Sequence, residues 1–272
     1  MPMREPVPME SACRRLPGHL LLLGLCLLGL AEAQDQTPLP DPHFHLYLLI
    51  GQSNMAGRGV VDEESTRIDP RVSMLAKDLT WQPARDPLHF DKPAAGVGPG
   101  LAFGKQLAQA EPQVRIGLIP CAVGGTSITV WVPGATDKAT ATHPYDDMLR
   151  RVREATKAGV LTGIIWHQGE SDVHAHVAYA QSLTALIARL RQDLAAGEIP
   201  FVAGELSNFK DPADPDTAAF NAALHELAQT VPHVGWVSAA GLEHKGDFLH
   251  YNAASARTLG QRYAAKMLDL QH

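Results

Sequence analysis

Five apolar, β-rich segments, each followed by a helical pattern, constrain the fold of this chain more than any other feature. The segments are His45–Ile50, Val114–Pro120, Gly163–His167, Pro200–Gly204 and Val234–Ser238. They are continuously apolar rather than alternating, as is typical of strands that are buried on both faces of a parallel sheet. The pattern therefore predicts parallel strands that are covered on both sides.

Helical patterns occupy the chain between and after these strands. Apolar residues recur there at three- and four-residue spacing, as at Leu183, Leu186 and Leu190. Asp216 and Asn252 precede two of these helices and are predicted as their N-caps. The predicted helices are Gly100–Ala110, Tyr145–Ala158, Val173–Ala195, Thr217–Thr230 and Ala253–Leu270. This alternation predicts a doubly wound α/β fold with helices on both faces of the sheet.

The length suits one α/β domain or two small ones, and the composition is that of an ordinary globular protein. The 272 residues are 45% hydrophobic and 19% charged, which is enough to bury a sizeable core. The formal net charge of -6 provides no basic patch, so we expect no nucleic-acid partner. The stretch from Arg58 to Pro99 is rich in Asp and Pro and only weakly periodic. It is predicted to form a long surface segment, the excursion, which passes over one side of the functional site.

The first 33 residues are predicted to be a secretory signal peptide. Arg14 and Arg15 precede the apolar run Leu20–Leu30, and Ala31-Glu32-Ala33 provides a small-residue cleavage site. The predicted organisation is a signal peptide at 1–33, a linker at 34–43 and a folded domain at 44–272, in a secreted or periplasmic protein with no membrane contact after cleavage. Alternatives are an uncleaved anchor, for which the run is short, and lipidation at Cys26.

Only Cys121 remains after such a cleavage, because Cys13 and Cys26 lie in the signal segment. The mature chain therefore has no internal disulfide. Cys121 follows an apolar strand, and we interpret it as a buried small apolar residue rather than a nucleophile.

A serine follows the first predicted strand, in Gly51-Gln52-Ser53-Asn54-Met55. In an α/β sheet the ligand site lies outside the carboxyl ends of the strands. A serine on such a strand-to-helix turn can present its hydroxyl there, while backbone N–H groups stabilise developing negative charge. Helix capping by Ser53 explains this segment equally well when it is taken alone.

Two further polar segments follow the second and third strands. Gly124-Gly125 lies in the first of them, where paired glycines allow a backbone N–H to approach an oxyanion, although a simple tight turn explains them too. The second is His167-Gln168-Gly169-Glu170-Ser171-Asp172. Its Gln168 amide is a candidate oxyanion donor, whereas Asp172 is predicted to cap the following helix. A metal site formed by His167, Glu170, His174 and His176 matches no compact zinc spacing.

The last segment contains Asp247 and His250, three residues apart after the fifth strand. Asp247 can bond one imidazole nitrogen of His250 and leave the other free to take a serine proton. One Asp-x-x-His is weak evidence in a chain with 13 histidines. The conjunction with Ser53 is stronger, because a serine hydroxyl needs an adjacent base to become nucleophilic.

These four segments, in this order, resemble the SGNH/GDSL hydrolase superfamily, and more closely its carbohydrate acetylesterases of family six and the sialate O-acetylesterase-like domains. The resemblance extends from His45 to about Leu270. It implies a three-layer α/β/α, flavodoxin-like sandwich around a five-stranded parallel sheet. It also implies Ser53 as nucleophile, His250 as general base and Asp247 as the acid that orients it.

The resemblance further implies an oxyanion hole formed by the Ser53 N–H, an N–H at Gly124 or Gly125, and the Gln168 side chain. Gln52, Asn54 and Glu170 are expected to support the site, with Glu170 either a second acid near His250 or part of a polar network. Trp131 and Trp81 could stack on a sugar ring, although an isolated tryptophan more often belongs to the core.

The implied activity is removal of O-acetyl groups from a carbohydrate through an acetyl-serine intermediate, with no cofactor and no metal. Acetylxylan or a similar polysaccharide is the expected substrate, and O-acetylated sialic acid is the alternative. A non-catalytic carbohydrate-binding protein would normally lack one of Ser53, Asp247 and His250, which are all present. A lipase or thioesterase is a third possibility, but no lid helix is evident.

Overall fold

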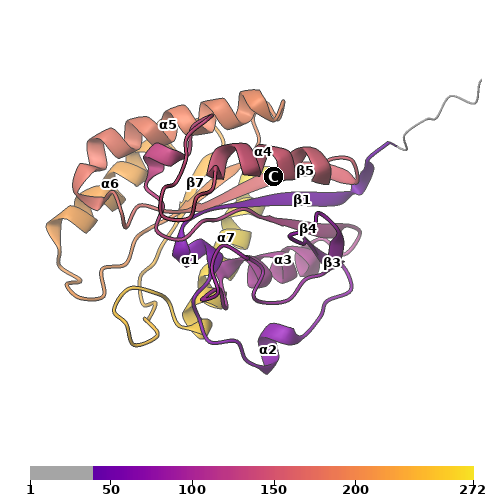
Figure 1. Ribbon diagram of the computed structural model, residues 1–272, viewed down its shortest axis with the longest axis horizontal. Coiled ribbons are helices and arrows are strands. Elements are labelled where there is room, and N and C mark those ends of the chain that lie inside the picture. The colour runs from indigo at the N-terminus through magenta and orange to yellow at the C-terminus, as the bar shows by residue number, and fades with distance from the viewer. Residues whose placement is uncertain (1–38) are drawn as a thin grey trace, which may run out of the picture. The chain divides into compact units, whose positions relative to one another are not determined.

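A seven-stranded sheet forms the centre of the computed structural model, which describes residues 39–272 (Figure 1). The predicted signal peptide and residues 34–38 of the predicted linker lie outside the described residues. The strand order is β3-β2-β4-β1-β5-β6-β7. The strands are β1 (Asp41–Gly51), β2 (Val72–Leu75), β3 (Trp81–Pro83), β4 (Arg115–Pro120), β5 (Gly159–His167), β6 (Phe201–Gly204) and β7 (Val234–Val237).

The five predicted strands correspond to β1, β4, β5, β6 and β7, which are all parallel. The predicted strand count was wrong, because β2 and β3 also belong to the sheet. Both come from the segment predicted to be an excursion, and β2 pairs in parallel with the outer side of β4. β3 then turns back antiparallel to β2 and closes this edge. Asp41 pairs with Gly159, so residues 41–43 extend β1 rather than forming a linker.

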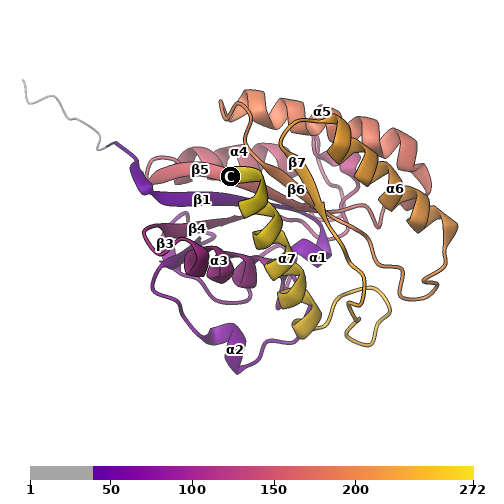
Figure 2. The same ribbon diagram turned by 180° about the vertical axis from the view of Figure 1, so that it is seen from behind.

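Helices cover both faces of the sheet, which gives the expected three-layer α/β/α arrangement (Figures 1 and 2). Because side chains alternate across a strand, Leu46, Leu48 and Ile50 of β1 face one core, and Tyr47 and Leu49 face the other. The first core is covered by α4 (Pro144–Ala155), α5 (His176–Asp193) and α6 (Pro215–Thr230), and the second by α3 (Pro99–Ala110) and α7 (Ala253–Gln271). The short helices are α1 (Ser53–Ala56), α2 (Glu63–Thr66), η1 (Ile128–Val130) and η2 (Val173–Ala175).

Side-chain hydrogen bonds to backbone N–H groups fix the first residues of α6 and α7. Asn252 caps α7 as predicted, with its side chain accepting the Ser255 N–H at 2.8 Å. The predicted cap of α6 was wrong: Asp214, not Asp216, accepts the Thr217 N–H at 2.8 Å. Pro215 then occupies the first helical position, where its missing N–H has no cost. Within residues 39–272, no helix is both long and apolar enough to cross a membrane.

Candidate active site

The turn between β1 and α1 places Ser53 at the carboxyl ends of the parallel strands. Gly51 has a φ of 131°, and a Cβ on it would lie 2.1 Å from the His167 carbonyl oxygen. Only glycine allows this close approach of β1 to the end of β5. The Gln52 N–H then donates to the His167 carbonyl at 2.8 Å. Ser53 is therefore the first residue of α1, and its N–H is one that has no acceptor within the helix.

Three predicted side chains meet at this edge. His250 Nε2 lies 3.1 Å from Ser53 Oγ, and His250 Nδ1 lies 2.7 Å from Asp247 Oδ2. Ser53 and His250 come from positions 197 residues apart. Helix capping is not the role of the serine here, because Gln52 occupies the N-cap position and the Ser53 hydroxyl contacts the imidazole. This arrangement can transfer a proton from the hydroxyl to the ring.

The Asp247 carboxylate is held in its ionised form. Partial burial raises its pKa, but the backbone N–H and ring of His250 and the Leu249 N–H all donate hydrogen bonds to it. These bonds dominate and hold the pKa of Asp247 well below its ordinary value. The carboxylate can therefore keep the proton of the imidazole on Nδ1, which leaves Nε2 as the acceptor that faces the serine.

The turn at Gly124 is clamped by residues of the excursion. Its N–H donates to Asp91 Oδ2 at 2.9 Å, and Lys92 Nζ donates to its carbonyl at 2.7 Å. Arg58 pairs with the same Asp91 oxygen at 2.6 Å, and both side chains are buried. A Cβ on Gly124 would lie 2.3 Å from Arg58 Nη2, so a side chain at this position would have to displace the Arg58 guanidinium from its place beside Asp91. Arg58 and Asp91 were not predicted, since no local pattern links them to the turn.

The Gln168 amide lies buried beneath the site, with several protein acceptors around it. Its Nε2 lies 3.0 Å from the Thr126 carbonyl, 2.5 Å from Asp172 Oδ2 and 3.3 Å from Gln52 Oε1. An amide nitrogen carries two hydrogens, so three acceptors compete for them. An oxyanion would enter this network as a further acceptor.

The Asp172 side chain does not cap the helical turn that follows it, which corrects its predicted role. No side-chain capping bond is present at η2. Instead the carboxylate accepts the Ser127 hydroxyl at 2.6 Å and the Ile128 N–H at 2.9 Å, in addition to Gln168. Asp172 thus joins the loop after β4 to the loop after β5, which are the two loops that flank Ser53.

If Gln168 is the oxyanion donor that the resemblance implies, replacing it with alanine should lower kcat by about 10²- to 10³-fold. The measurement is steady-state hydrolysis of p-nitrophenyl acetate, with thermal unfolding in parallel. Gln82 is an exposed residue of β3, and Gln82→Ala provides the matched control. A Gln168→Ala protein that retained more than half of kcat would exclude the amide from the oxyanion hole.

Asn54 connects α1 both to Glu170, which follows β5, and to the loop between β7 and α7. Asn54 Nδ2 donates to Glu170 Oε1 at 2.6 Å and to the Leu249 carbonyl at 3.3 Å, while its Oδ1 accepts the Tyr251 N–H at 3.3 Å. Glu170 Oε1 also lies 3.8 Å from His167 Nε2. These contacts place Glu170 in a polar network, the second of its two predicted roles. Asn54 holds both neighbours of the histidine that faces Ser53.

Neither tryptophan considered for sugar stacking lies open to the site. Trp131 is fully buried, donates from Nε1 to Thr126 Oγ1 at 3.2 Å and packs edge-on against Trp166. Its predicted role as a substrate contact was therefore wrong, because both faces belong to the core. Trp81 packs against Phe44, near the opposite end of β1 from Ser53.

The side chains considered for a metal site do not gather. His167 is fully buried and contacts the Tyr263 hydroxyl at 3.1 Å, whereas His174 is exposed and bonds Asp216. Across residues 39–272, no group of three or more His, Cys, Asp and Glu side chains is arranged to hold a metal ion.

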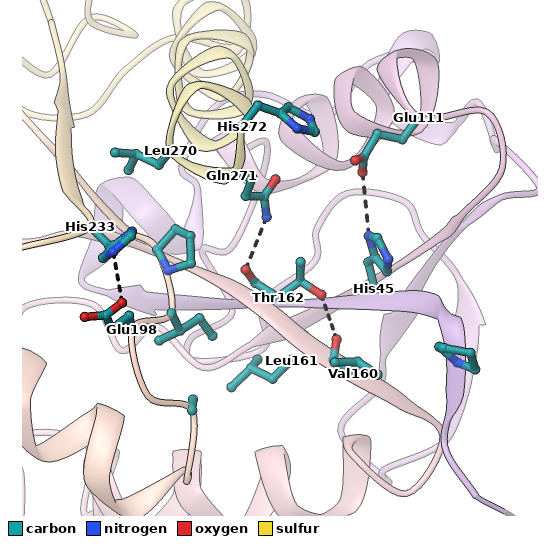
Figure 3. Close-up of a pocket in the computed structure, with 14 residues that line it drawn as sticks. His45, Glu111, Val160, Leu161, Thr162, Glu198, His233, Leu270, Gln271 and His272 are labelled. Atoms are coloured by element: carbon teal, nitrogen blue, oxygen red, sulfur yellow. Dashed lines mark hydrogen bonds and ion pairs between the residues drawn. The ribbon is translucent and has the colours of Figure 1, made fainter.

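A cavity of about 530 Å³ lies at the amino ends of the strands, which is the end of the sheet opposite to Ser53 (Figure 3). It is lined by residues near the amino ends of β1, β5 and β7, among them His45, Thr162 and His233. His45 faces Glu111 at 3.6 Å and His233 faces Glu198 at 3.2 Å. Ligands of α/β sheets bind at the carboxyl ends of the strands, and Ser53 lies there. This cavity is therefore not part of the site around Ser53.

Comparison with known proteins identifies the family. Residues 43–269 match the family described as "Carbohydrate esterase, sialic acid-specific acetylesterase". A relative from Arabidopsis thaliana, described as a probable carbohydrate esterase, is 33% identical over 262 residues, which cover 88% of this chain and 95% of the relative. An X-ray structure of an Arabidopsis thaliana protein has a TM-score of 0.72 at 32% identity and covers 84% of this chain and 99% of that chain.

A carbohydrate acetylesterase from Xanthomonas citri shares the fold, with a TM-score of 0.66 at 20% identity over 83% of this chain and 56% of that chain. The family match and the Arabidopsis relative define the class: the protein is a carboxylic ester hydrolase. More particularly, the chain belongs to the sialic acid-specific acetylesterase family of carbohydrate esterases. The resemblance inferred from its four polar segments is thus confirmed.

Proposed function

We propose that this protein is a serine esterase that removes O-acetyl groups from a neutral polysaccharide such as acetylxylan, through an acetyl-Ser53 intermediate. The observation that supports it most directly is the continuous chain of contacts from Ser53 Oγ to His250 Nε2 at 3.1 Å and from His250 Nδ1 to Asp247 Oδ2 at 2.7 Å. Each of these three side chains contacts the partner that its proposed role requires.

In the first step, Ser53 Oγ attacks the acetyl carbonyl carbon while His250 Nε2 takes the hydroxyl proton. The C–O bond to the sugar then breaks, and His250 returns the proton to the leaving sugar oxygen. In the second step, His250 takes a proton from water as the water oxygen attacks the acetyl carbon. Acetate leaves, and the proton returns to Ser53 Oγ. Asp247 remains ionised throughout and orients the imidazole.

Three donors are proposed to stabilise the oxyanion of both steps: the Ser53 N–H, one N–H of the glycine turn and the Gln168 amide. The Gly124 N–H already donates to the Asp91 carboxylate. We therefore assign the turn's contribution to the Gly125 N–H. Gln168 would have to exchange one of its present acceptors for the oxyanion.

The substrate can be tested by measuring acetate release from acetylated xylan and from O-acetyl sialic acid, with p-nitrophenyl acetate as the activated reference ester. We expect acetylated xylan to be the better natural substrate. Faster release from O-acetyl sialic acid would favour the alternative activity of a sialate O-acetylesterase. Hydrolysis of p-nitrophenyl acetate with no release from either glycan would contradict both assignments, and a longer acyl donor would then be tested.

We also propose that the protein is exported, with residues 1–33 as a signal peptide that is cleaved and residues 44–272 as the esterase domain. The basic, apolar and small-residue segments from Arg14 to Ala33 support this proposal. Amino-terminal sequencing of the protein recovered from its producing cells tests it, because a first residue before Gln34 would contradict the proposed cleavage site.

A further inference from the structure

Lys92, in the excursion, contacts the glycine turn beside Ser53, and the proposed chemistry gives it no role. Its ammonium donates to the Gly124 carbonyl at 2.7 Å, which is a charge-assisted hydrogen bond. The neighbouring Asp91 accepts the Gly124 N–H at 2.9 Å. Two adjacent residues of one segment therefore bind both polar backbone atoms of Gly124, and the peptide groups on both sides of this glycine are held in place.

The bond from Lys92 also sets the direction of the next N–H along the chain. The Gly124 carbonyl and the Gly125 N–H belong to one peptide group, and this peptide bond is trans. In a planar trans group the C=O and the N–H point in opposite directions. A donor that binds the carbonyl oxygen on one side therefore fixes the Gly125 N–H toward the other side. Gly125 has a φ of 86°, which glycine adopts without a Cβ clash.

The Gly125 N–H is a free donor close to the proposed nucleophile. No hydrogen bond within residues 39–272 uses this N–H, whereas the Gly124 N–H is taken by Asp91. Gly124 adjoins Ser53, since a Cβ on the glycine would lie 3.4 Å from the serine Cβ. An unpaired backbone donor next to a nucleophile is what an oxyanion hole requires.

The local charges strengthen this donor. Arg58 pairs with Asp91 at 2.6 Å, so these two charges offset each other. The Lys92 ammonium is then the net positive charge beside the turn, and a Cβ on Gly125 would lie 3.7 Å from its Nζ. A cation that is bound to a peptide carbonyl polarises the peptide group, which makes the N–H of that group a better donor to an anion.

We propose that Lys92 is a positioning residue for ester hydrolysis, which orients and polarises the Gly124–Gly125 peptide group so that the Gly125 N–H binds the oxyanion. The inference rests on the proposed function, because it assumes an oxyanion on the acetyl carbon and the Gly125 N–H as one of its donors. Lys92 acts through the backbone and does not touch the substrate. Its effect is therefore expected in the transition state, as a change in kcat with KM unaltered.

The first test is steady-state hydrolysis of p-nitrophenyl acetate by Lys92→Met protein, in which the side chain keeps its apolar length but loses its charge and its donor. We expect kcat to fall about tenfold to hundredfold, which is less than the loss of a whole oxyanion donor. Lys92→Arg keeps a cationic donor and should recover most of kcat. Lys157 is exposed after α4 and pairs with Glu154, so Lys157→Met is the matched control and should keep wild-type kcat.

The second test uses methylboronic acid, whose boron bonds to the serine oxygen and becomes tetrahedral, as the acetyl carbon does in the proposed mechanism. A boron-bound oxygen then takes the place of the oxyanion. The inhibition constant should rise in Lys92→Met protein by the same factor as kcat falls, and Lys92→Arg should restore both. In NMR spectra of the wild-type protein, the boronate should shift the amide proton resonance of Gly125, and this shift should be smaller in Lys92→Met.

Lys92→Met protein with more than half of wild-type kcat would overturn the proposal, as would a loss of kcat with unchanged boronate affinity. A rise in KM alone would make Lys92 a substrate contact and would overturn it too. If thermal unfolding shows that Lys92→Met is not folded, Lys92→Gln takes its place under the same criteria. Failure of the proposed function is seen separately, as wild-type protein that neither hydrolyses p-nitrophenyl acetate nor binds the boronate.

Discussion

Ser53→Ala is expected to lower kcat for p-nitrophenyl acetate by roughly 10⁴- to 10⁶-fold, because the variant lacks the atom that is acylated in the proposed mechanism. The His250 imidazole would keep its contact with Asp247, and the backbone donors of the site would remain. Substrate affinity should therefore change little while turnover is lost. The measurement is steady-state hydrolysis, together with mass spectrometry of acid-quenched wild-type enzyme to detect an acetyl group on the peptide that carries Ser53.

The matched control for this variant is Ser182→Ala. Ser182 is exposed on α5, and its hydroxyl bonds only the Ala178 carbonyl of its own helix. Both variants should unfold at temperatures close to that of the wild-type protein. Normal hydrolysis by purified Ser53→Ala would remove Ser53 from the mechanism, and an acetyl group trapped on another residue would identify a different nucleophile.

Asp247→Asn is expected to lower kcat by about 10⁴-fold while leaving the fold intact. The asparagine oxygen can still accept the Leu249 and His250 N–H groups, which now bond Asp247 Oδ1 at 3.0 and 2.9 Å. Its amide nitrogen, however, would donate to His250 Nδ1. The ring proton would then move to Nε2, where it faces the Ser53 hydroxyl and prevents it from losing its own proton.

The pKa of Asp247 is depressed in the folded protein. Its contribution to the free energy of unfolding is therefore fully present above the ordinary aspartate pKa of the unfolded state, and it is lost as pH falls through the folded pKa. Titration of Asp247 should therefore change neither the stability nor kcat of the wild-type protein at neutral or mildly acidic pH. Asp269→Asn on α7 is the control. An Asp247→Asn protein with more than a tenth of wild-type kcat would contradict the orienting role.

The five central strands could be predicted because burial on both faces leaves a strong local signal. Every residue of β1 from Leu46 to Ile50 is buried, so the sequence is continuously apolar there. The edge strands β2 and β3 have only four and three residues, and β3 ends in Pro83. Such short segments carry no clear periodicity, and the neighbouring strand decides their conformation.

The positions of the site residues could be predicted only where they follow strands. Ser53, Gln168 and His250 each lie after a predicted strand, at the edge where the ends of parallel strands gather. Arg58 and Asp91 could not be found in this way, since they reach Gly124 across long loop separations. Asp172 was misinterpreted because an aspartate before a helix suggests a cap, whereas its bonds go to Ser127 and Ile128 of another loop.

The separation of 197 residues between Ser53 and His250 means that the reacting groups come from opposite ends of the domain. β1, the strand that leads to Ser53, lies between β4 and β5, whereas His250 follows β7 at the far edge of the sheet. A fragment that ends at β7 would hold the proposed nucleophile without its base, and one that begins after α1 would hold the proposed base alone. In the proposed mechanism, esterase activity therefore requires that segments from both sides of the sheet have folded against each other.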